Sequence, residues 1–174
     1  MSDELFAQLK AMEGRESKPR TGNDRVNEAM IRHWCEAMQD ANPLYSDEDF
    51  ARASGFRGTV APPTMVQAYC TPPLWPKSET APDPIFEAVR KCTEKGYSAS
   101  LGISIAYEFL QPLYASDEVV YTIKLLSVSP RKTTRVGTGY FLTSQYSYRN
   151  QTGQPTCNQL LTVFQYQAGS QTKP

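Results

Sequence analysis

The sequence predicts an α+β domain in which helices come first and an antiparallel meander of strands follows. Apolar residues recur at helical spacing up to about residue 95 and alternate with smaller or polar residues from Tyr97 onward. A hairpin turn signal at residues 150–153 falls within the second half. Helices followed by a run of strands are typical of the α+β class. The 174 residues are enough for a real core, so we expect a single domain over residues 1–174.

Composition and charge argue against several classes of function. The chain is 40% hydrophobic and 21% charged, which is ordinary for a globular protein. Lys plus Arg and Asp plus Glu each number 18, so the charge gives no support to binding of nucleic acid or of an anionic membrane. No apolar run reaches the length of a membrane span, and the acidic N-terminus lacks the features of a signal peptide. We therefore expect a cytoplasmic protein.

The cysteines and the single histidine narrow the chemistry further. Cys35, Cys70, Cys92 and Cys157 are scattered without a Cys-x-x-Cys pair, which is typical of reduced and mostly buried thiols. With one His in the chain, no metal site is expected. That residue, His33, lies inside a predicted helix, where a surface or partly packed position is more common than a catalytic one.

Two amphipathic helices are predicted near the N-terminus. Residues 2–12 carry apolar side chains at helical spacing, and a polar connector completes an N-terminal segment over residues 1–26. Asn27 is then the N-cap of the second helix. The apolar stripe of this helix consists of Met30, Ile31, Trp34 and Met38.

Two more helices are predicted before residue 72. The first covers residues 47–53 and is capped by Ser46. The second begins near Pro63, because a proline is favoured at the start of a helix, where its missing N–H would be unsatisfied anyway. This helix contains Met65 and reads as buried, so it is the candidate for the centre of the domain.

A proline-rich loop over residues 72–84 separates this helix from the next. Its prolines exclude a regular element, and a loop of this length is either mobile or draped over the domain. We expect Leu74 and Trp75 to be packed against an apolar surface. A short helix is then predicted over residues 85–95.

Four strands are predicted in the second half. The first is expected to be half-buried, with alternating apolar residues on one face: Leu101, Ile103, Ile105, Tyr107 and Phe109. The other three cover residues 118–128, 135–148 and 159–166. The third strand should present one apolar face made of Tyr140, Leu142, Tyr146 and Tyr148. The polar tail after Ala168 is expected to fray.

The turn that follows the second helix carries the most informative motif. Its residues are Asp40-Ala41-Asn42-Pro43-Leu44-Tyr45, and Pro43 forces the helix to stop before it. This stretch resembles the Asp-x-Asn-Pro-x-His signature of the MaoC-like (R)-specific enoyl-CoA hydratases. The resemblance implies a hot-dog fold, in which a curled antiparallel sheet is wrapped round a central helix. It also implies an Asp–His acid/base pair that adds water across a 2-enoyl-CoA.

This chain departs from the signature at its last residue, because Tyr45 stands where the family has His. A general base works best when its pKa lies near the working pH. A free His has a pKa of about 6.5 and a free Tyr about 10. Tyr45 is therefore a poor base for activating water, although it could donate a hydrogen bond or pack against an acyl chain. A simple turn between two helices is the alternative interpretation of the whole stretch.

A second departure lies at the start of the central helix. The family typically has Ile-Ala-His-Gly there, and the resemblance implies that the Gly N–H polarises the thioester carbonyl. The matching residues here are Val60-Ala61-Pro62-Pro63, and Pro63 has no N–H to donate. Loss of one such donor costs about 3 kcal/mol in typical acyl-transfer enzymes. Together the two departures indicate a pocket without chemistry of its own.

A small basic cluster is the candidate for CoA contact. Arg131, Lys132 and Arg135 surround Thr133 between the second and third predicted strands. Such cations and hydroxyls would suit the three phosphate groups of CoA. The alternative interpretation of the cluster is a solvated basic hairpin. With Tyr45 and Met65, these residues form the expected substrate-binding set, and a CoA thioester is expected as substrate with no separate cofactor.

The resemblance covers residues 20 to 166. It is strongest to the N-terminal MaoC-type, FAS1-like dehydratase domain of the larger subunit of bacterial steroid side-chain enoyl-CoA hydratases, which act in cholesterol catabolism. It implies a non-catalytic subunit that pairs with a small catalytic MaoC-like subunit in a heterodimer or heterotetramer, with a thiolase or aldolase as a further partner. Such larger subunits usually continue into a zinc-ribbon and OB-type domain, which this sequence does not contain.

Two other functions remain open. One is a self-sufficient homodimeric enoyl-CoA hydratase or 3-hydroxyacyl dehydratase that uses Asp40, Asn42 and Tyr45. The other is an acyl-CoA-binding module without catalysis in any assembly.

Overall fold

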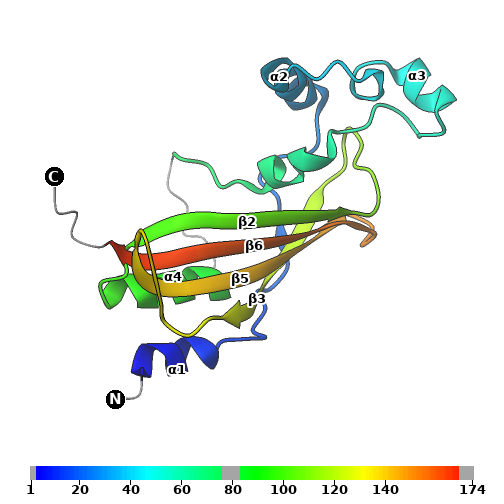
Figure 1. The fold of residues 1–174 in the computed structure, drawn as a ribbon. Helices are drawn as coiled ribbons and strands as arrows, with labels where there is room; N and C mark the ends of the chain where they lie inside the picture. The colour runs from blue at the N-terminus through cyan, green and yellow to red at the C-terminus, as the bar shows by residue number, and fades with distance from the viewer. Residues whose placement is uncertain (1–2, 76–82, 169–174) are drawn as a thin grey trace, which may run out of the picture.

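A single curled antiparallel sheet organises the chain in the computed structural model, which describes residues 3–75 and 83–168. The six strands are β1 (Arg20–Thr21), β2 (Ala99–Phe109), β3 (Val119–Val128), β4 (Lys132–Thr134), β5 (Gly137–Asn150) and β6 (Pro155–Ala168). Their order is β1-β3-β5-β6-β2, and β4 pairs with the first residues of β5 (Figure 1). The strands predicted at 118–128, 135–148 and 159–166 are confirmed, with β5 shifted by two residues toward the C-terminus and β6 longer than predicted.

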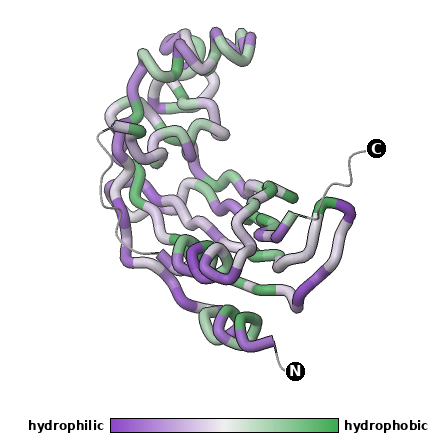
Figure 2. The backbone as a smooth tube through the Cα atoms, turned by 90° about the vertical axis from the view of Figure 1, so that its left-hand side faces the viewer, coloured by the Kyte–Doolittle hydropathy of each residue, from purple (hydrophilic) through white to green (hydrophobic). Residues whose placement is uncertain are grey.

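Helices cover one face of this sheet and extend beyond one end of it. They are α1 (Glu4–Lys10), α2 (Glu28–Met38), η1 (Pro43–Tyr45), α3 (Glu48–Ala53), η2 (Pro63–Cys70) and α4 (Pro84–Glu94), of which η1 and η2 are 3₁₀ segments. Elements α1 and α4 lie along the sheet, whereas α2, η1 and α3 stand away from it as a separate lobe (Figures 1 and 2). This lobe comprises residues 28–59. The α+β class and the curled sheet of a hot-dog fold are confirmed.

Short polar side chains begin most of the α-helices. The side chains of Asp3, Asn27, Asp47 and Asp83 each accept a hydrogen bond from the backbone N–H three residues later. The predicted cap Asn27 is therefore confirmed. The prediction that Ser46 caps α3 was wrong by one residue, because the Asp47 carboxylate occupies that position. Pro84, predicted in the proline-rich loop, is instead the first residue of α4, where a proline loses no hydrogen bond.

The helix predicted after Pro63 is present and buried, but its geometry differs from that of an α-helix. Element η2 is an eight-residue 3₁₀ segment rather than an α-helix, and the chain leaves it at Thr71 in an extended conformation. Proline pairs at 62–63 and 72–73 limit both ends, since each proline removes a backbone donor. The helical layer is therefore shared between η2 and α4 on the same face of the sheet.

Two hydrophobic clusters reflect this division. In one, Met65 and Tyr69 of η2 pack with Ile31 of α2 and with Val119 and Tyr148 of the sheet. The other joins α1 and α4 to the opposite end of the same sheet face, and it contains Leu5, Leu9, Ala88, Cys92, Leu125 and Leu142. The predicted apolar face of β5 is confirmed, because Tyr140, Leu142, Tyr146 and Tyr148 all contribute to the clusters.

Strand β2 is more exposed than predicted. Leu101, Ile103, Ile105 and Phe109 are between 42% and 49% exposed, because β2 lies at the edge of the sheet. These residues also do not share one face. Leu101 pairs with Phe164 and Ile105 with Leu161, so a bulge near Ile103 moves the later residues to the opposite face from Leu101.

Buried thiols and phenols make the stability of this fold sensitive to alkaline pH. Burial raises the pKa of the Cys70 and Cys92 thiols to about 12, and it also raises the pKa of the Tyr69 and Tyr148 hydroxyls. These groups stay protonated in the folded chain at a pH where the unfolded chain ionises, about 8.5 for Cys and about 10 for Tyr. Their contribution is full below about pH 8.5 and is lost as the pH rises.

We expect the free energy of unfolding to fall by about 1.4 kcal/mol per pH unit for each buried thiol above about pH 9. Urea unfolding at a series of pH values between about 8 and 10.5 measures this slope. The Cys92→Ala variant should show a shallower slope, although its stability at neutral pH will be lower. A urea midpoint that stays constant over this range would contradict the assignment.

Candidate functional site

The motif turn is held together by its own polar side chains. Helix α2 ends at Met38, and Gln39 adopts a left-handed conformation with φ 55° and ψ 38°. The Asp40 Oδ1 atom accepts a hydrogen bond from the Asn42 N–H at 3.1 Å. In turn, the Asn42 Oδ1 atom accepts one from the Leu44 N–H at 3.1 Å and caps η1. The carboxylate and the amide thus both stabilise the turn, as their short side chains allow.

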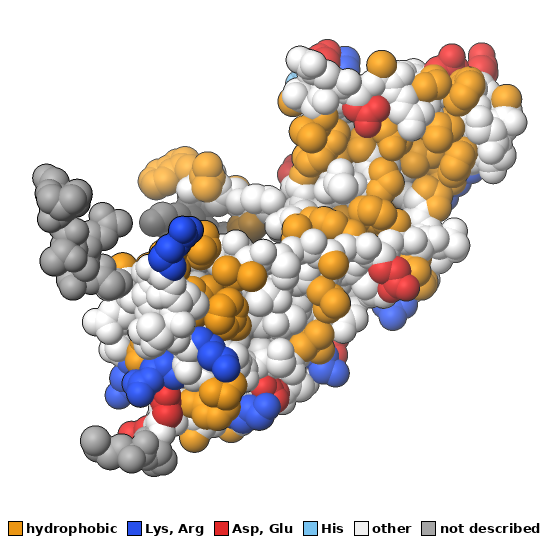
Figure 3. All heavy atoms as spheres, in the orientation of Figure 1, with side chains coloured by type: hydrophobic (Ala, Val, Ile, Leu, Met, Phe, Trp, Pro, Cys, Tyr) orange, Lys and Arg blue, Asp and Glu red, His pale blue; other side chains and the backbone are white. Residues whose placement is uncertain are grey.

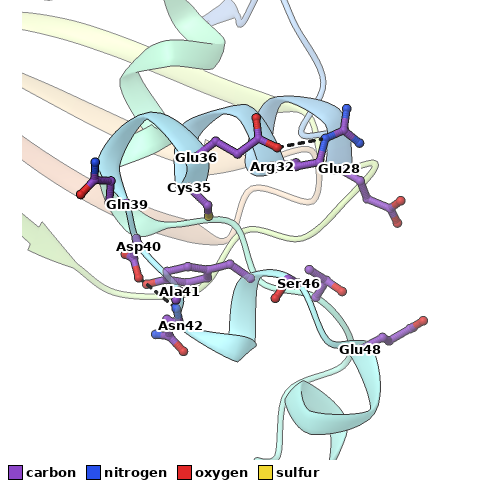
Figure 4. A pocket seen from close by; sticks show the side chains of 12 residues that line it. Glu28, Arg32, Cys35, Glu36, Gln39, Asp40, Ala41, Asn42, Ser46 and Glu48 are labelled. Atoms are coloured by element: carbon purple, nitrogen blue, oxygen red, sulfur yellow. Dashed lines mark hydrogen bonds and ion pairs between the residues drawn. The ribbon is translucent and has the colours of Figure 1, made fainter.

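Tyr45 forms part of the wall between two pockets. The larger pocket is about 670 Å³ and lies between α2 and the turn (Figure 4). The smaller, about 240 Å³, lies between the turn, the start of η2 and the end of β2. Residue 45 lines both of them. The position that carries His in the family signature is therefore the meeting point of the two pockets.

The larger pocket is open, and charged side chains line part of it. Its charged lining residues are Glu28, Arg32, Glu36, Asp40 and Glu48. The Arg32 Nε atom lies 3.8 Å from the Glu36 carboxylate, and both side chains project from α2 above the turn in Figure 4. His33 is exposed on α2 and does not line this pocket.

The smaller pocket is mostly apolar and contains the proline that replaces the predicted amide donor. It is lined by Leu44, Tyr45, Phe56, residues 60–63, Val66, residues 109–113, Thr156 and Cys157. Pro63 begins η2 in the wall of this pocket and offers no N–H to a ligand. The Thr156 hydroxyl is buried without a hydrogen-bond partner among the described residues.

The environment of Tyr45 keeps its hydroxyl protonated to a higher pH than the hydroxyl of a free tyrosine. Partial burial raises the pKa of its hydroxyl, and the negative charge of Asp40 raises it further, while a hydrogen bond with Asn42 acts in the opposite direction. The hydroxyl therefore stays protonated at neutral pH. It can donate a hydrogen bond but cannot take a proton from water.

Met65, predicted to contact the substrate, is buried in the core instead of lining a pocket wall. It is 1% exposed, and its sulfur accepts a hydrogen bond from the Tyr69 hydroxyl at 3.7 Å. Neither of the two pockets beside the motif includes it.

The predicted CoA cluster lies far from the motif within one chain. Arg131, Lys132, Thr133 and Arg135 are exposed around β4, next to the first residue of β5, and Arg131 lies 3.8 Å from the Asp3 carboxylate. The lobe is attached at the other end of β5, which spans about 45 Å for its 14 residues. Basic side chains gather near α1 in Figure 3, and apolar ones gather on the lobe. CoA contact by this cluster stays a prediction.

An ion pair that sequence reasoning missed attaches the lobe to the sheet. Arg57 Nη2 donates to both oxygens of the Asp117 carboxylate at 2.6 and 2.7 Å. Asp117 also accepts the Tyr114 N–H at 2.9 Å and the Gln151 side-chain amide at 3.1 Å. The Arg57 guanidinium lies 4.1 Å from the centre of the Tyr114 ring. No local pattern marks this pair, because its two residues are 60 positions apart.

Backbone hydrogen bonds complete the attachment. The Ala61 N–H donates to the Leu113 carbonyl at 2.8 Å, and Val60 forms an isolated bridge with Tyr114. The Val60 N–H donates to the Leu44 carbonyl at 3.0 Å, which ties the motif turn to the segment just before η2. Contacts with the connection between β2 and β3 thus help to determine the position of Tyr45 relative to Pro63.

The curled sheet, the shared helical layer and the motif lobe define a MaoC-like hot-dog domain. Residues 11–159 match the family model described as "FAS1-like, dehydratase domain region", and the chain belongs to this family.

Within that family, two curated relatives are hydratase subunits. The chain is 36% identical, over 91% of its length, to a probable enoyl-CoA hydratase alpha subunit of Thermomonospora curvata. It is 34% identical, over 80% of its length, to the 3-oxo-4,17-pregnadiene-20-carboxyl-CoA hydratase alpha subunit of Mycobacterium tuberculosis. These alignments cover 50% and 44% of the relatives, so the chain spans about half their length.

Solved structures agree with this assignment. A chain of the ChsH1-ChsH2 complex from Mycobacterium tuberculosis superposes with a TM-score of 0.86 at 28% identity, covering 97% of this chain and 93% of that one. The (R)-hydratase from A. caviae involved in PHA biosynthesis superposes with a TM-score of 0.58 at 16% identity, covering 87% and 94% of the two chains. The second likeness shows the fold alone.

Two other kinds of feature are absent from the part of the chain that the structure describes. There, no helix is long and apolar enough to cross a membrane. The same residues contain no group of three or more His, Cys, Asp or Glu side chains placed to hold a metal ion.

Proposed function

We propose that this chain is the non-catalytic half of a heteromeric 2-enoyl-CoA hydratase. Tyr45 stands at the position of the family's base with a raised pKa, and Pro63 removes the amide that would hold the thioester oxygen. These two replacements carry the proposal, because both lie in the wall of the same pocket. A small MaoC-like partner would supply the Asp and His, in a heterodimer or heterotetramer.

In this assignment the reaction takes place on the partner's residues. The partner's base removes a proton from water, the hydroxyl group adds to C3 of the enoyl thioester, and C2 receives a proton. This chain contributes walls of the acyl and CoA channel. The protonated Tyr45 hydroxyl is a hydrogen-bond donor in that wall, and the small apolar pocket beside it suits an acyl segment.

The exposed edge of the sheet supports the heteromer. Among the described strands β2 pairs only with β6, so one edge of this 11-residue strand has unpaired backbone groups. A long, apolar and uncharged edge invites pairing with another chain, and Glu108 is the single charged residue in β2. The names of the relatives, which are alpha subunits, and the two-protein complex that contains the structural match point the same way.

The divided helical layer supports a bulky acyl group. A pocket of about 420 Å³ lies between η2 and α4, where an uninterrupted central helix would pack. Its lining includes Gln67, Cys70, Phe86, Tyr121, Ile123, Tyr146 and Tyr148. A ring-bearing acyl group, as in the steroid thioester named for the relative from Mycobacterium tuberculosis, is the substrate class that we propose.

Hydratase assays with 2-enoyl-CoA thioesters test the proposal. We expect no turnover from the isolated chain, and turnover when a His-bearing MaoC-like partner is added. In that complex, Asp40→Ala should leave kcat within about twofold, whereas loss of an acid/base residue costs about 10²–10⁴-fold. Tyr45→Phe is the matched control for the packing role of the ring, because this variant removes the hydroxyl and keeps the ring.

Three outcomes would end the proposal. Full activity of the isolated chain would show a self-sufficient enzyme, and a fall of 10²-fold or more for Asp40→Ala would place an acid or base in this chain. Binding of CoA esters without turnover in any assembly would indicate a binding module.

A further inference from the structure

A buried amide on β6 has no hydrogen-bond partner for its N–H groups. The Gln159 side chain belongs to a residue that is 0% exposed, and its Nε2 atom has no partner among the described residues. Its Oε1 atom accepts a hydrogen bond from the Tyr148 hydroxyl at 2.7 Å. A buried N–H without an acceptor costs free energy, so a group of this kind in a folded protein needs an explanation.

Tyr148 and Gln159, called the buried pair below, lie at the floor of the pocket between η2 and α4. Tyr148 lines this pocket of about 420 Å³, as does Tyr146. Gln159 stands opposite Tyr146 in the β5–β6 ladder, and residues directly opposite each other share a face of the sheet. Both tyrosines pack on the face that η2 covers. The buried pair therefore points toward the helical layer at the place where this layer is divided.

Other polar side chains that line the same pocket already have partners. Arg20 pairs with Asp83 at 3.1 Å. The Gln67 Oε1 atom accepts a hydrogen bond from the Tyr107 hydroxyl at 3.1 Å. The buried pair differs from them, because it keeps a donor that no atom of the described chain accepts.

The apolar residues next to this pocket do not fill it. Leu74 and Trp75 follow the lining residues Thr71 and Pro72, but they do not line the pocket themselves. They are 92% and 85% exposed, so the prediction that they pack against an apolar surface was wrong. The pocket thus stays accessible from the side of these two residues.

The buried pair has a spare donor in either orientation of the Gln159 amide. In the orientation described, the Tyr148 hydroxyl donates to the amide oxygen and the amide N–H groups are unused. After a half-turn of the amide, Nε2 would donate to the Tyr148 oxygen and the Tyr148 proton would face the pocket. Burial raises the pKa of the Tyr148 hydroxyl, so this proton is retained at neutral pH. An acceptor atom in the pocket therefore adds one hydrogen bond without removing another.

We propose that the buried pair binds an oxygen atom on the ring system of the acyl group, either a ketone or a hydroxyl oxygen. The inference rests on the proposed function, which assigns a ring-bearing acyl group to this pocket, and deepens it by naming the substituent that the pocket recognises. Tyr148 donates to that oxygen, and Gln159 holds the Tyr148 hydroxyl in place. A site that hydrogen-bonds a substituent discriminates against the analogue that lacks it, because its own polar groups then stay unpaired.

Steady-state kinetics of the complex between the full chain and a His-bearing MaoC-like partner test the inference. Two ring-bearing 2-enoyl-CoA thioesters are compared, one with a ring ketone and one with a methylene group in its place. We expect kcat/KM to be about 10-fold or more higher for the ketone. Tyr148→Phe and Gln159→Leu should each reduce this preference to about twofold or less, by lowering kcat/KM for the ketone.

Two further variants separate recognition from folding. The Tyr148→Phe/Gln159→Leu double variant replaces both partners with apolar groups of similar shape, which limits the loss of stability. Its kcat/KM for the methylene thioester should stay within about threefold of wild type. Gln165→Leu is the matched control, because Gln165 is also buried on β6 but its Nε2 atom donates to the Tyr97 carbonyl at 2.8 Å. This variant should keep the wild-type preference for the ketone.

The wild-type comparison decides the inference without any variant. Equal kcat/KM values for the two thioesters would overturn it and leave the proposed function standing. Equal losses for both thioesters in the double variant would show that the buried pair is structural, which would also overturn it. No turnover of either thioester by the complex would refute the proposed function and the inference with it.

Discussion

Replacing Gly139 with Ala is expected to lower the free energy of unfolding by at least about 3 kcal/mol. Gly139 lies in β5 opposite Tyr166 of β6. A Cβ atom at this position would lie 2.1 Å from the Gln165 carbonyl oxygen and 2.6 Å from the Tyr166 Cα atom. Both contacts are with backbone, so no side-chain rotation relieves them. The two longest strands would have to separate where they hold the sheet together.

Chemical unfolding of the variant and wild type measures this loss, and the thermal midpoint should fall by about 6–12 °C. Gly102→Ala is the matched control, because it is also a strand glycine but its Cβ would meet nothing within 4 Å. That variant should be neutral or more stable by up to about 1 kcal/mol. Equal stability of Gly139→Ala and Gly102→Ala would show that β5 and β6 do not approach each other as closely at Gly139 as described.

Replacing Asp117 with Ala is expected to cost about 3 kcal/mol. The Asp117 side chain is 4% exposed, and it accepts hydrogen bonds from Arg57, the Tyr114 N–H and Gln151. Its removal leaves the Tyr114 and Gln151 donors without their acceptor and weakens the attachment of the lobe, which backbone hydrogen bonds at Val60 and Ala61 still hold. Arg57→Ala should cost less, about 1 kcal/mol, because the Arg57 side chain is 58% exposed and solvent screens its charge.

Urea unfolding measures both costs, and limited proteolysis reports whether the lobe detaches before the sheet unfolds. Glu118→Ala is the matched control, since this neighbouring carboxylate pairs with Arg25 at the surface. It should change the free energy of unfolding by less than about 1 kcal/mol. Equal effects of Asp117→Ala and Glu118→Ala would show that the buried carboxylate does not attach the lobe.

Much of the secondary structure could be predicted because its signals are local. Asn27 lies directly before an apolar helical stripe, and its side chain caps α2 as predicted. The turn signal at residues 150–153 joins β5 and β6, where the Asn150 side chain accepts the N–H groups of Thr152 and Gln154. In both cases the interacting groups lie within four residues of one another, so the sequence pattern contains the whole interaction.

Other features could not be predicted because they depend on which strand becomes a neighbour. The alternation in β2 predicts a half-buried strand with one apolar face, but its edge position exposes it and the bulge near Ile103 divides that face. The residues after Pro63 predict a buried helix that stops before Pro72, and the segment that forms there, η2, has 3₁₀ rather than α-helical geometry. The contact between β5 and β6 that excludes a side chain at Gly139 is likewise invisible in the sequence.

By itself, the sequence determined the family resemblance and the two replacements that argue against catalysis, because the identity of a side chain and the absence of a proline N–H need no coordinates. Only the tertiary structure decided that Tyr45 divides two pockets, that the basic cluster lies at the far end of β5, and that Leu74 and Trp75 are exposed. These are statements about distance and exposure between segments far apart in the chain. They depend on how the sheet curls and which of its edges stays unpaired, which no short window of residues encodes.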